Sequence, residues 1–167
     1  DTGGFRFSNT TATCLHIVAE LVDRGVSPYE THRRVYGTSP RRRIRLLQSA
    51  LSSLEVDERS GVAWMTVPSA EYEAVGAGPD DLEGFVDYPR SIEGVEVGLL
   101  FRTIARKGVK VSFRSNGEVD VNTLARRFGG GGHIRASGAL IQGPLDQVQI
   151  DVIRATREAV ELSQPRP

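Results

Sequence analysis

The chain has 167 residues, of which 39% are hydrophobic and 25% are charged, with 21 basic and 21 acidic side chains and a formal net charge of zero. This composition fits a globular domain with a buried core. A net charge of zero excludes a strong overall electrostatic attraction to nucleic acid. A single cysteine excludes an internal disulfide. No apolar run approaches the roughly 18 residues that span a membrane, and no signal peptide is visible, so we expect a cytoplasmic protein without membrane contact.

The N-terminal third of the chain is predicted to be helical. Apolar residues recur at helical spacing after N-cap-type residues, and glycines mark the ends of the helices. The expected helices cover residues 10–25, 28–36 and 40–56. The first turns of the third helix are crowded with arginines, which we interpret as a solvated face, with phosphate contact as the alternative. These are Arg41, Arg42, Arg43 and Arg45.

The remainder of the chain alternates between strand and helix patterns, so we expect an α/β fold there. A turn at residues 57–61 separates the two parts, and we place a domain boundary between residues 57 and 58. The expected strands cover residues 61–67, 95–105, 109–115 and 136–142, and the expected helices begin near residues 69, 82, 120 and 144. The second and third strands are predicted to form a hairpin around a short turn.

Basic side chains gather in the second half of the chain. Eight lysines and arginines lie between residues 100 and 135, against two acidic residues, so an anion site is expected there. Within the hairpin, Arg102 and Arg114 each follow a phenylalanine. Because side chains alternate between the faces of a strand, both arginines are expected on one accessible face of the pair. Two solvated surface arginines are the alternative.

Four consecutive glycines at residues 129–132 precede His133. Glycine allows the backbone to approach a ligand closely and to present N–H groups to an anion, and histidine adds a donor that can carry charge near neutral pH. A helix precedes the run, whereas P-loops and dinucleotide-binding turns run from strand to glycines to helix. The pattern therefore predicts phosphate bound by a nest of backbone N–H groups and His133. A plain helix-to-strand turn is the alternative.

The glycine run and several motifs around it resemble a known family. The sequence FGGGGHIRASG at residues 128–138 resembles the signature of the DHH-associated domain, the C-terminal lobe of DHH-family phosphoesterases. LFRT at 100–103, VSFRSN at 111–116 and VNTLA at 121–125 follow the same order and spacing as in that domain. The opening DTGGFRF, with Asn9 and Thr10, is similar to the end of the preceding catalytic lobe. Within that family, the sequence is most similar to the nano-RNase and pAp-phosphatase branch.

The resemblance implies a mixed β-sheet domain with flanking helices at residues 58–167, preceded at residues 1–57 by the end of the catalytic lobe and a helical linker. It implies a phosphoesterase whose missing N-terminal lobe binds two Mn²⁺ ions. The substrate would be short RNA, degraded as by an exonuclease or oligoribonuclease, or 3′-phosphoadenosine 5′-phosphate (pAp).

Carried over residue by residue, the resemblance assigns one metal ligand and seven residues that hold nucleotide or phosphate. Asp1 matches the metal-ligand aspartate of the last metal motif. The phosphate-binding positions are Gly130, Gly131, Gly132, His133, Arg102, Arg114 and Ser115. No DHH triplet occurs and the first three metal motifs are absent, so we assign no catalytic residue and expect the 167 residues alone to be inactive.

Three alternative functions remain open at this point. A cyclic dinucleotide phosphodiesterase of the same family shares both lobes. A nucleic-acid-binding module without hydrolase activity is the alternative from another class, since related glycine–histidine domains end alanyl-tRNA synthetases. A structural domain with an incidental glycine turn is the plainest of the three.

Overall fold

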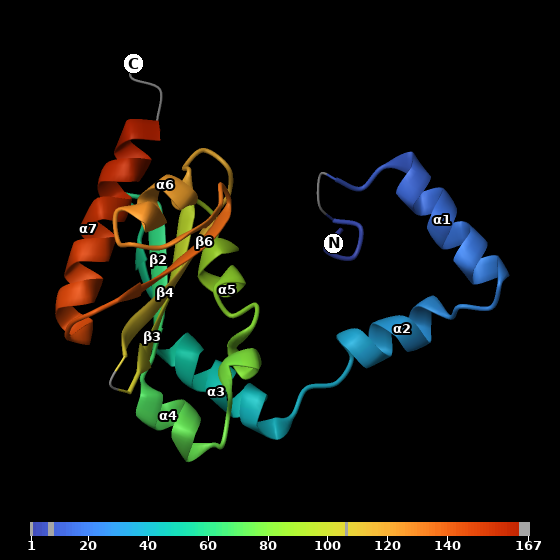
Figure 1. Ribbon diagram of the computed structural model, residues 1–167, viewed down its shortest axis with the longest axis horizontal. Helices are drawn as coiled ribbons and strands as arrows, with labels where there is room; N and C mark the ends of the chain where they lie inside the picture. Colours follow the sequence, from blue (N-terminus) through green and yellow to red (C-terminus); the bar gives the residue numbers. More distant parts are fainter. Residues whose placement is uncertain (1, 7–8, 106, 164–167) are drawn as a thin grey trace. The chain divides into compact units, whose positions relative to one another are not determined.

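The computed structural model of the chain describes residues 2–6, 9–105 and 107–163. The chain forms two compact units, Asp1–Pro40 and Arg41–Pro167 (Figure 1). The sequence-based division between residues 57 and 58 assigned helix α3 (Arg41–Ser52) to the first part. In the structure α3 lies in the second unit, because Leu46 and Ala50 are buried in a cluster with residues of the sheet.

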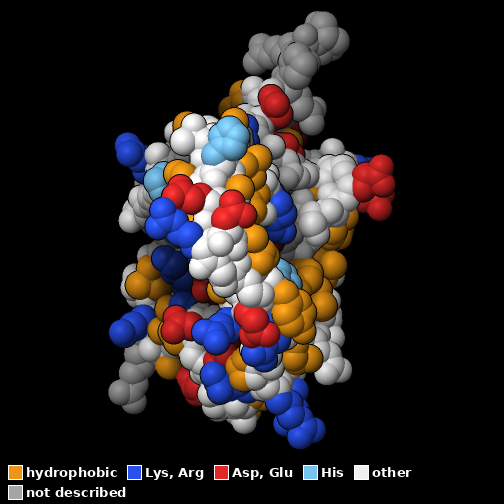
Figure 2. All heavy atoms as spheres, turned by 90° about the vertical axis from the view of Figure 1, so that its right-hand side faces the viewer, with side chains coloured by type: hydrophobic (Ala, Val, Ile, Leu, Met, Phe, Trp, Pro, Cys, Tyr) orange, Lys and Arg blue, Asp and Glu red, His pale blue; other side chains and the backbone are white. Residues whose placement is uncertain are grey.

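The first unit contains helices α1 (Ala12–Asp23) and α2 (Pro28–Val35). The side chain of Thr11 accepts a hydrogen bond from the backbone of Cys14, and that of Ser27 accepts one from Glu30, so both helices begin at an N-cap residue. No residue of either helix is buried. Apolar side chains are therefore exposed along both helices (Figure 2), among them Leu15, Ile17, Leu21, Tyr29 and Val35.

The second unit is built on a six-stranded mixed sheet with strand order β1-β2-β3-β4-β6-β5. Its strands are β1 (Glu55–Asp57), β2 (Val62–Val67), β3 (Val97–Ile104), β4 (Gly108–Ser115), β5 (Gly131–His133) and β6 (Ala136–Ile141). Only β2 and β3 pair in parallel among these strands, and the expected hairpin of β3 and β4 is present. Two short strands, β1 and β5, were not predicted.

Helices cover both faces of this sheet (Figure 1). Beyond α3 they are α4 (Ser69–Ala74), the 3₁₀ helix η1 (Pro79–Leu82), α5 (Asp87–Arg90), α6 (Val121–Arg126) and α7 (Leu145–Ser163). The expected α/β fold, a mixed sheet with flanking helices, is confirmed. Where one short helix was expected over residues 82–92, η1 and α5 stand apart, because Gly84 turns the chain between them with a positive φ of 78°.

The alternation of side chains divides the hydrophobic residues between two buried clusters. Odd-numbered residues of β3 and β4, such as Leu99 and Phe113, pack with α6 and α7 on one face. Met65 and Leu100 pack with α3, η1 and Phe85 on the other face. Apolar surface removed from water on each face accounts for the stability of the layers, at about 25 cal/mol per Å². The sheet is thus a two-sided scaffold, and the side facing α3 and α5 is the one that carries Arg102 and Arg114.

Two of the arginines at the start of α3 make structural contacts. The Arg42 guanidinium donates to the Asp81 carboxylate at 2.9 Å. Arg43 donates to the carbonyl oxygens of Asp81 and Glu83, both at 2.7 Å, and stacks 5.0 Å from the centre of the Phe85 ring. These contacts attach the N-terminal turn of α3 to η1. Arg42 keeps an exposed side chain, as expected of a solvated face, while it pairs with Asp81, and Arg43 is half-buried by its contacts.

The Asp81 contacts predict an acid-sensitive stability. The hydrogen bond from Arg42, and then that from the Gly78 backbone, lower the pKa of Asp81 below its ordinary value of 3.8. A carboxylate with a lowered folded-state pKa stabilises the fold at neutral pH and loses that contribution as the pH falls below 3.8 and through the lowered pKa. We expect Asp81→Asn to unfold more easily in urea at neutral pH than the wild type, and the two stability curves to converge in acid. Asp80→Asn, an exposed neighbour, should match the wild type throughout; a parallel offset of Asp81→Asn at every pH would contradict the assignment.

Candidate phosphate-binding face

Strand register aligns side chains into three rows on the sheet face opposite α6 and α7. The first row is Gly98, Arg114, Ala136 and His133; the second is Leu100, Ser112, Gly138 and Gly131; the third is Arg102, Lys110 and Leu140. Two residues along a strand span about 6.6–6.8 Å, which is the separation between neighbouring rows. We call the part of these rows on β4, β6 and β5, together with Arg102, the open face.

Helices cover only one half of this side of the sheet. Gly98 lies directly under α5, because a Cβ built on it would come 2.6 Å from the backbone nitrogen of Arg90. Leu100 is buried in the cluster with α3. The open face is more accessible: Ser112 and Gly138 are half-buried, and Leu140 is 44% exposed. The sheet therefore presents a partly sheltered surface beside α5.

Three cations lie on the open face without a carboxylate partner in the described part of the chain. Arg102, Lys110 and Arg114 are all half-buried. Arg114 donates to the carbonyl oxygen of Phe113 at 3.0 Å, and the ion pairs of residues 2–6, 9–105 and 107–163 involve other arginines. A half-buried cation is costly unless it is paired. An anionic ligand would supply the missing partner.

The glycine run forms the edge strand of the sheet, and two of its glycines are sterically required. A Cβ on Gly130 would come 2.2 Å from the carbonyl oxygen of Gly138, and one on Gly132 would come 2.6 Å from that of Ala136. Gly132 also has a φ of 150°, which side chains rarely adopt. A Cβ on Gly131 would meet only the Asn122 side-chain oxygen, at 3.7 Å. The run thus lets β5 lie flat against β6.

The backbone N–H groups of the glycine run do not form the free anion nest that the sequence predicted. Gly129 and Gly130 donate to carbonyl oxygens at the end of α6, and Gly132 donates to the Asn122 side chain at 3.1 Å. Asn122 is in turn held by the N-cap of α6. The Thr123 hydroxyl, followed by its backbone N–H, donates to Asp120 and lowers the pKa of that carboxyl. A phosphate at this edge would therefore be held by side chains, and not by free N–H groups of these three glycines.

The predicted site residues are only partly brought together. Arg102, Arg114, Gly131 and His133 lie in the three rows, and His133 is exposed at the sheet edge. Gly130 and Gly132 support the strand from which His133 extends. Ser115 is buried on the other face, in register with Val97, and its hydroxyl has no hydrogen-bond partner among the described residues. Asp1 lies outside the described residues.

Sequence reasoning missed three residues of this region. Lys110 and Ser112 lie on the open face, and Asn122 anchors the glycine strand. A signal for the first two was available: residues 110, 112 and 114 alternate with the apolar residues 109, 111 and 113, so they share one face of β4. The role of Asn122 depends on its contact with Gly132, ten residues further along the chain, which no local pattern indicates.

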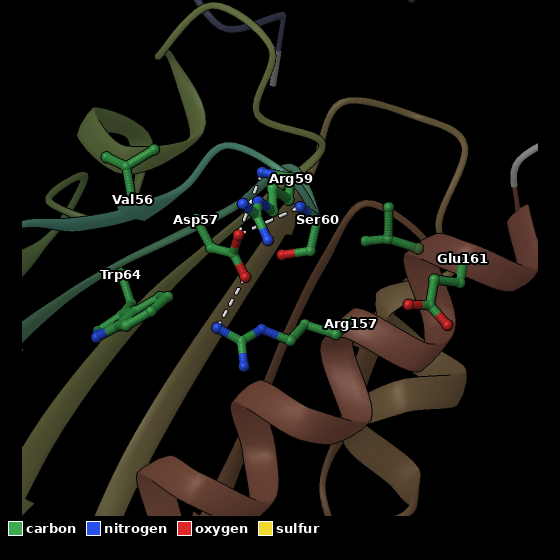
Figure 3. A pocket seen from close by; sticks show the side chains of 8 residues that line it. Val56, Asp57, Arg59, Ser60, Trp64, Arg157 and Glu161 are labelled. Carbon is green, nitrogen blue, oxygen red and sulfur yellow. Dashed lines mark hydrogen bonds and ion pairs between the residues drawn. The ribbon is translucent and has the colours of Figure 1, made fainter.

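A separate hollow of about 570 Å³ lies between the β1–β2 turn and α7 (Figure 3). The Arg157 guanidinium binds the Asp57 carboxylate there at 2.7 Å. Hydrogen bonding from Ser60, followed by the charge of Arg157, lowers the pKa of Asp57. Because Trp64, which lines the hollow, pairs with Leu99 of the α7 side, the hollow opens on the opposite face from Arg102 and Arg114. Its Arg157 is neutralised by Asp57 and Glu161 also lines the hollow, whereas no carboxylate pairs with the three cations of the open face in the described ranges.

The two Mn²⁺ ions that the resemblance implies find no ligand set in the described ranges. No group of three or more His, Cys, Asp or Glu side chains there could hold a metal ion. The described residues therefore do not fit a metal centre of that kind. No helix in the same ranges is long and apolar enough to cross a membrane.

Comparison with known proteins gives the same assignment as the motifs. Residues 67–161 match the model of the DHHA1 domain. The chain belongs to the DHHA1 domain family. This range begins at the end of β2 and includes the three rows and the glycine strand. The predicted DHH-associated domain of the nano-RNase and pAp-phosphatase branch is thereby confirmed, with support from the relatives below.

Two curated relatives and one solved structure extend the comparison. The chain is 38% identical over 159 residues to the "Bifunctional oligoribonuclease and PAP phosphatase NrnA" of Thermus thermophilus, covering 95% of this chain and 47% of the relative. It is 31% identical over 141 residues to the NrnA of Bacillus subtilis, covering 84% and 44%. A Bacteroides fragilis exopolyphosphatase-related protein superposes with a TM-score of 0.90 at 30% identity, covering 98% of this chain and 48% of that one. The chain spans about half the length of the curated relatives it matches.

Proposed function

We propose that the DHHA1 chain is the nucleotide-binding part of a phosphoesterase that hydrolyses short oligoribonucleotides or pAp. The names of the curated relatives support this class of substrate. Residues 1–57 would be the end of a catalytic lobe and a helical linker, and residues 58–167 the binding domain. Hydrolysis, and the metal ions it needs, would belong to that lobe. A nucleotide substrate of this kind would be met in the cytoplasm, where we propose that the protein acts.

The observation that carries the proposal is the set of unpaired cations on the open face. Arg102 and Arg114 are half-buried on one side of the sheet, without a carboxylate partner in the described ranges. His133 ends the row that contains Arg114. Guanidinium and imidazole N–H groups form short, charge-assisted hydrogen bonds to phosphate oxygens. The small side chains between them leave room for a nucleotide to lie against the sheet.

We assign the terminal phosphate of the substrate to Arg114 and His133. Ala136 separates the two residues across neighbouring strands, and its methyl group is too small to obstruct a ligand that contacts both. Arg102 lies two rows away, about 13 Å along the strand direction, and would contact a more distant part of the nucleotide. The phosphate would be held by side chains on a rigid sheet, which fixes its position for attack by the other lobe.

Replacing Arg114 with alanine tests this assignment. We expect AMP to bind the chain about tenfold more weakly, because a hydrogen bond to a charged group is lost, and we expect added salt to narrow the difference. Calorimetric titration at two salt concentrations measures both effects. Arg154→Ala, which removes the same charge from an exposed position on α7, is the control. Equal affinity of wild type and Arg114→Ala at low salt would remove Arg114 from the site.

A further inference from the structure

Lys110 is the third cation of the open face, and the arrangement around it differs from that of Arg114. It pairs in register with Arg102 on one side and Leu140 on the other. Its ammonium does not extend straight outward. The Nζ atom lies over β6, 3.2 Å from the position that a Cβ on Gly138 would take. The side chain therefore leans by one row, from the third toward the second.

The lysine can take this position because the β6 and β5 residues of the second row are glycines, which have no side chains. Gly138 and Gly131 face each other directly across β6 and β5. At Gly138 a Cβ would also come 3.2 Å from the carbonyl oxygen of Val111, so an added methyl group would disturb both the lysine and the strand. The two half-buried glycines give a strip of backbone without side chains, with the Lys110 ammonium at its end. In the described ranges this ammonium forms no ion pair.

Like charges placed directly opposite each other across two strands are destabilising. Arg102 and Lys110 are such a pair. The lean of Lys110 moves its charge away from Arg102 and toward the row of Arg114. Two cationic positions result: one at Arg114 and His133 in the first row, and one at the Lys110 ammonium beside the second row; neighbouring rows are spaced by about 6.6–6.8 Å along the strands.

We propose that Lys110 binds a second phosphate and makes the open face selective for a nucleoside that carries phosphate on both its 3′ and 5′ oxygens. This inference rests on the proposed function. A nucleoside can span the distance between neighbouring rows, with one phosphate at Arg114 and His133 and the other at Lys110. Phosphate on both oxygens occurs in pAp and also at the 5′-phosphorylated end of an oligoribonucleotide, where the 3′ phosphate is a diester, so the same contact would serve both substrates.

Titration of AMP and pAp into the wild-type chain and Lys110→Met tests the proposal. Methionine keeps an unbranched side chain but removes the charge. We expect Lys110→Met to bind pAp about tenfold more weakly, the loss of one hydrogen bond to a charged group, and to bind AMP within about twofold of wild type, since the contact to the first phosphate is kept. In a plot of the logarithm of the pAp affinity against the logarithm of the salt concentration, the slope should become less steep by about one. Lys107→Met, in the exposed β3–β4 turn, removes the same charge and should change neither affinity.

Each remaining outcome has a distinct meaning. Equal losses for AMP and pAp, or no loss for either, would overturn the role of Lys110 and leave the proposed function in place. A folded wild-type chain that binds neither ligand would contradict the proposed function itself. The first nucleoside of the dinucleotide pApA also has phosphate on both its 3′ and 5′ oxygens, the 3′ one as a diester, so the loss should recur with it. Tighter wild-type binding of pApA than of pAp would identify the end of an RNA chain as the preferred source of that unit.

Discussion

Gly130→Ala is expected to destabilise the second unit by about 3 kcal/mol, near the upper end of what overpacking costs. The added Cβ would lie 2.2 Å from the carbonyl oxygen of Gly138 and 2.7 Å from the Cα and Cβ of Ala139. These are mostly backbone atoms of β6, an inner strand paired on both sides, so they cannot move without breaking the ladder. Thermal unfolding should show a decrease in Tm of about 10 °C.

The neighbouring glycine provides a matched control. Gly131→Ala adds the same methyl group to the next residue, the first of β5, where the nearest atom would be the Asn122 side-chain oxygen at an ordinary contact distance of 3.7 Å. We expect its Tm to stay within about 2 °C of wild type, as for most surface substitutions. If both variants unfold at the wild-type temperature, β5 does not pack against β6 as described.

His133→Ala is expected to weaken AMP binding by about 10- to 100-fold. The imidazole contributes a hydrogen bond to a charged phosphate, and such bonds contribute about 1.5–3 kcal/mol. Because His133 is exposed at the sheet edge, its removal should leave the free energy of unfolding within about 0.5 kcal/mol of wild type. Calorimetric titration and urea unfolding of the same samples separate the two effects.

The control for this variant is His16→Ala, which removes an exposed histidine from α1 in the first unit. Its affinity for AMP should match that of wild type. Unfolding of His133→Ala without a selective loss of affinity would show that the histidine has a structural role. A wild-type affinity in a folded His133→Ala variant would exclude it from the phosphate site.

Periodicity predicted most of the second unit because its strands and helices follow simple patterns. Side chains of β4 alternate strictly between buried and half-buried, and the same alternation predicted that Arg102 and Arg114 share a face. The alternation also argues against Ser115 beside Arg114, because consecutive residues of a strand point to opposite faces. The assignment of Ser115 came from the resemblance alone. In the structure Ser115 is buried on the face of the sheet that packs against α6 and α7.

The elements that the sequence did not predict depend on distant partners. β5 has two glycines in three residues and no strand propensity, and it forms because β6 supplies its hydrogen bonds. The third helix was expected to reach residue 56 but ends at Ser52. The Ser53 hydroxyl there accepts a hydrogen bond from the backbone of Thr66 at 2.8 Å, and the following residues pair with β2 as strand β1. No local pattern shows such contacts.

The central claim, that the open face binds nucleotide phosphate, is tested most directly by calorimetric titration of AMP and pAp into the 167-residue chain without added metal. We predict saturable binding of both ligands, tighter for pAp, and weakened in Arg114→Ala and His133→Ala. This result would show that recognition of the phosphate belongs to the DHHA1 domain and not to metal ions elsewhere. Absence of binding to the folded wild-type chain, or binding that neither variant weakens, would contradict the claim.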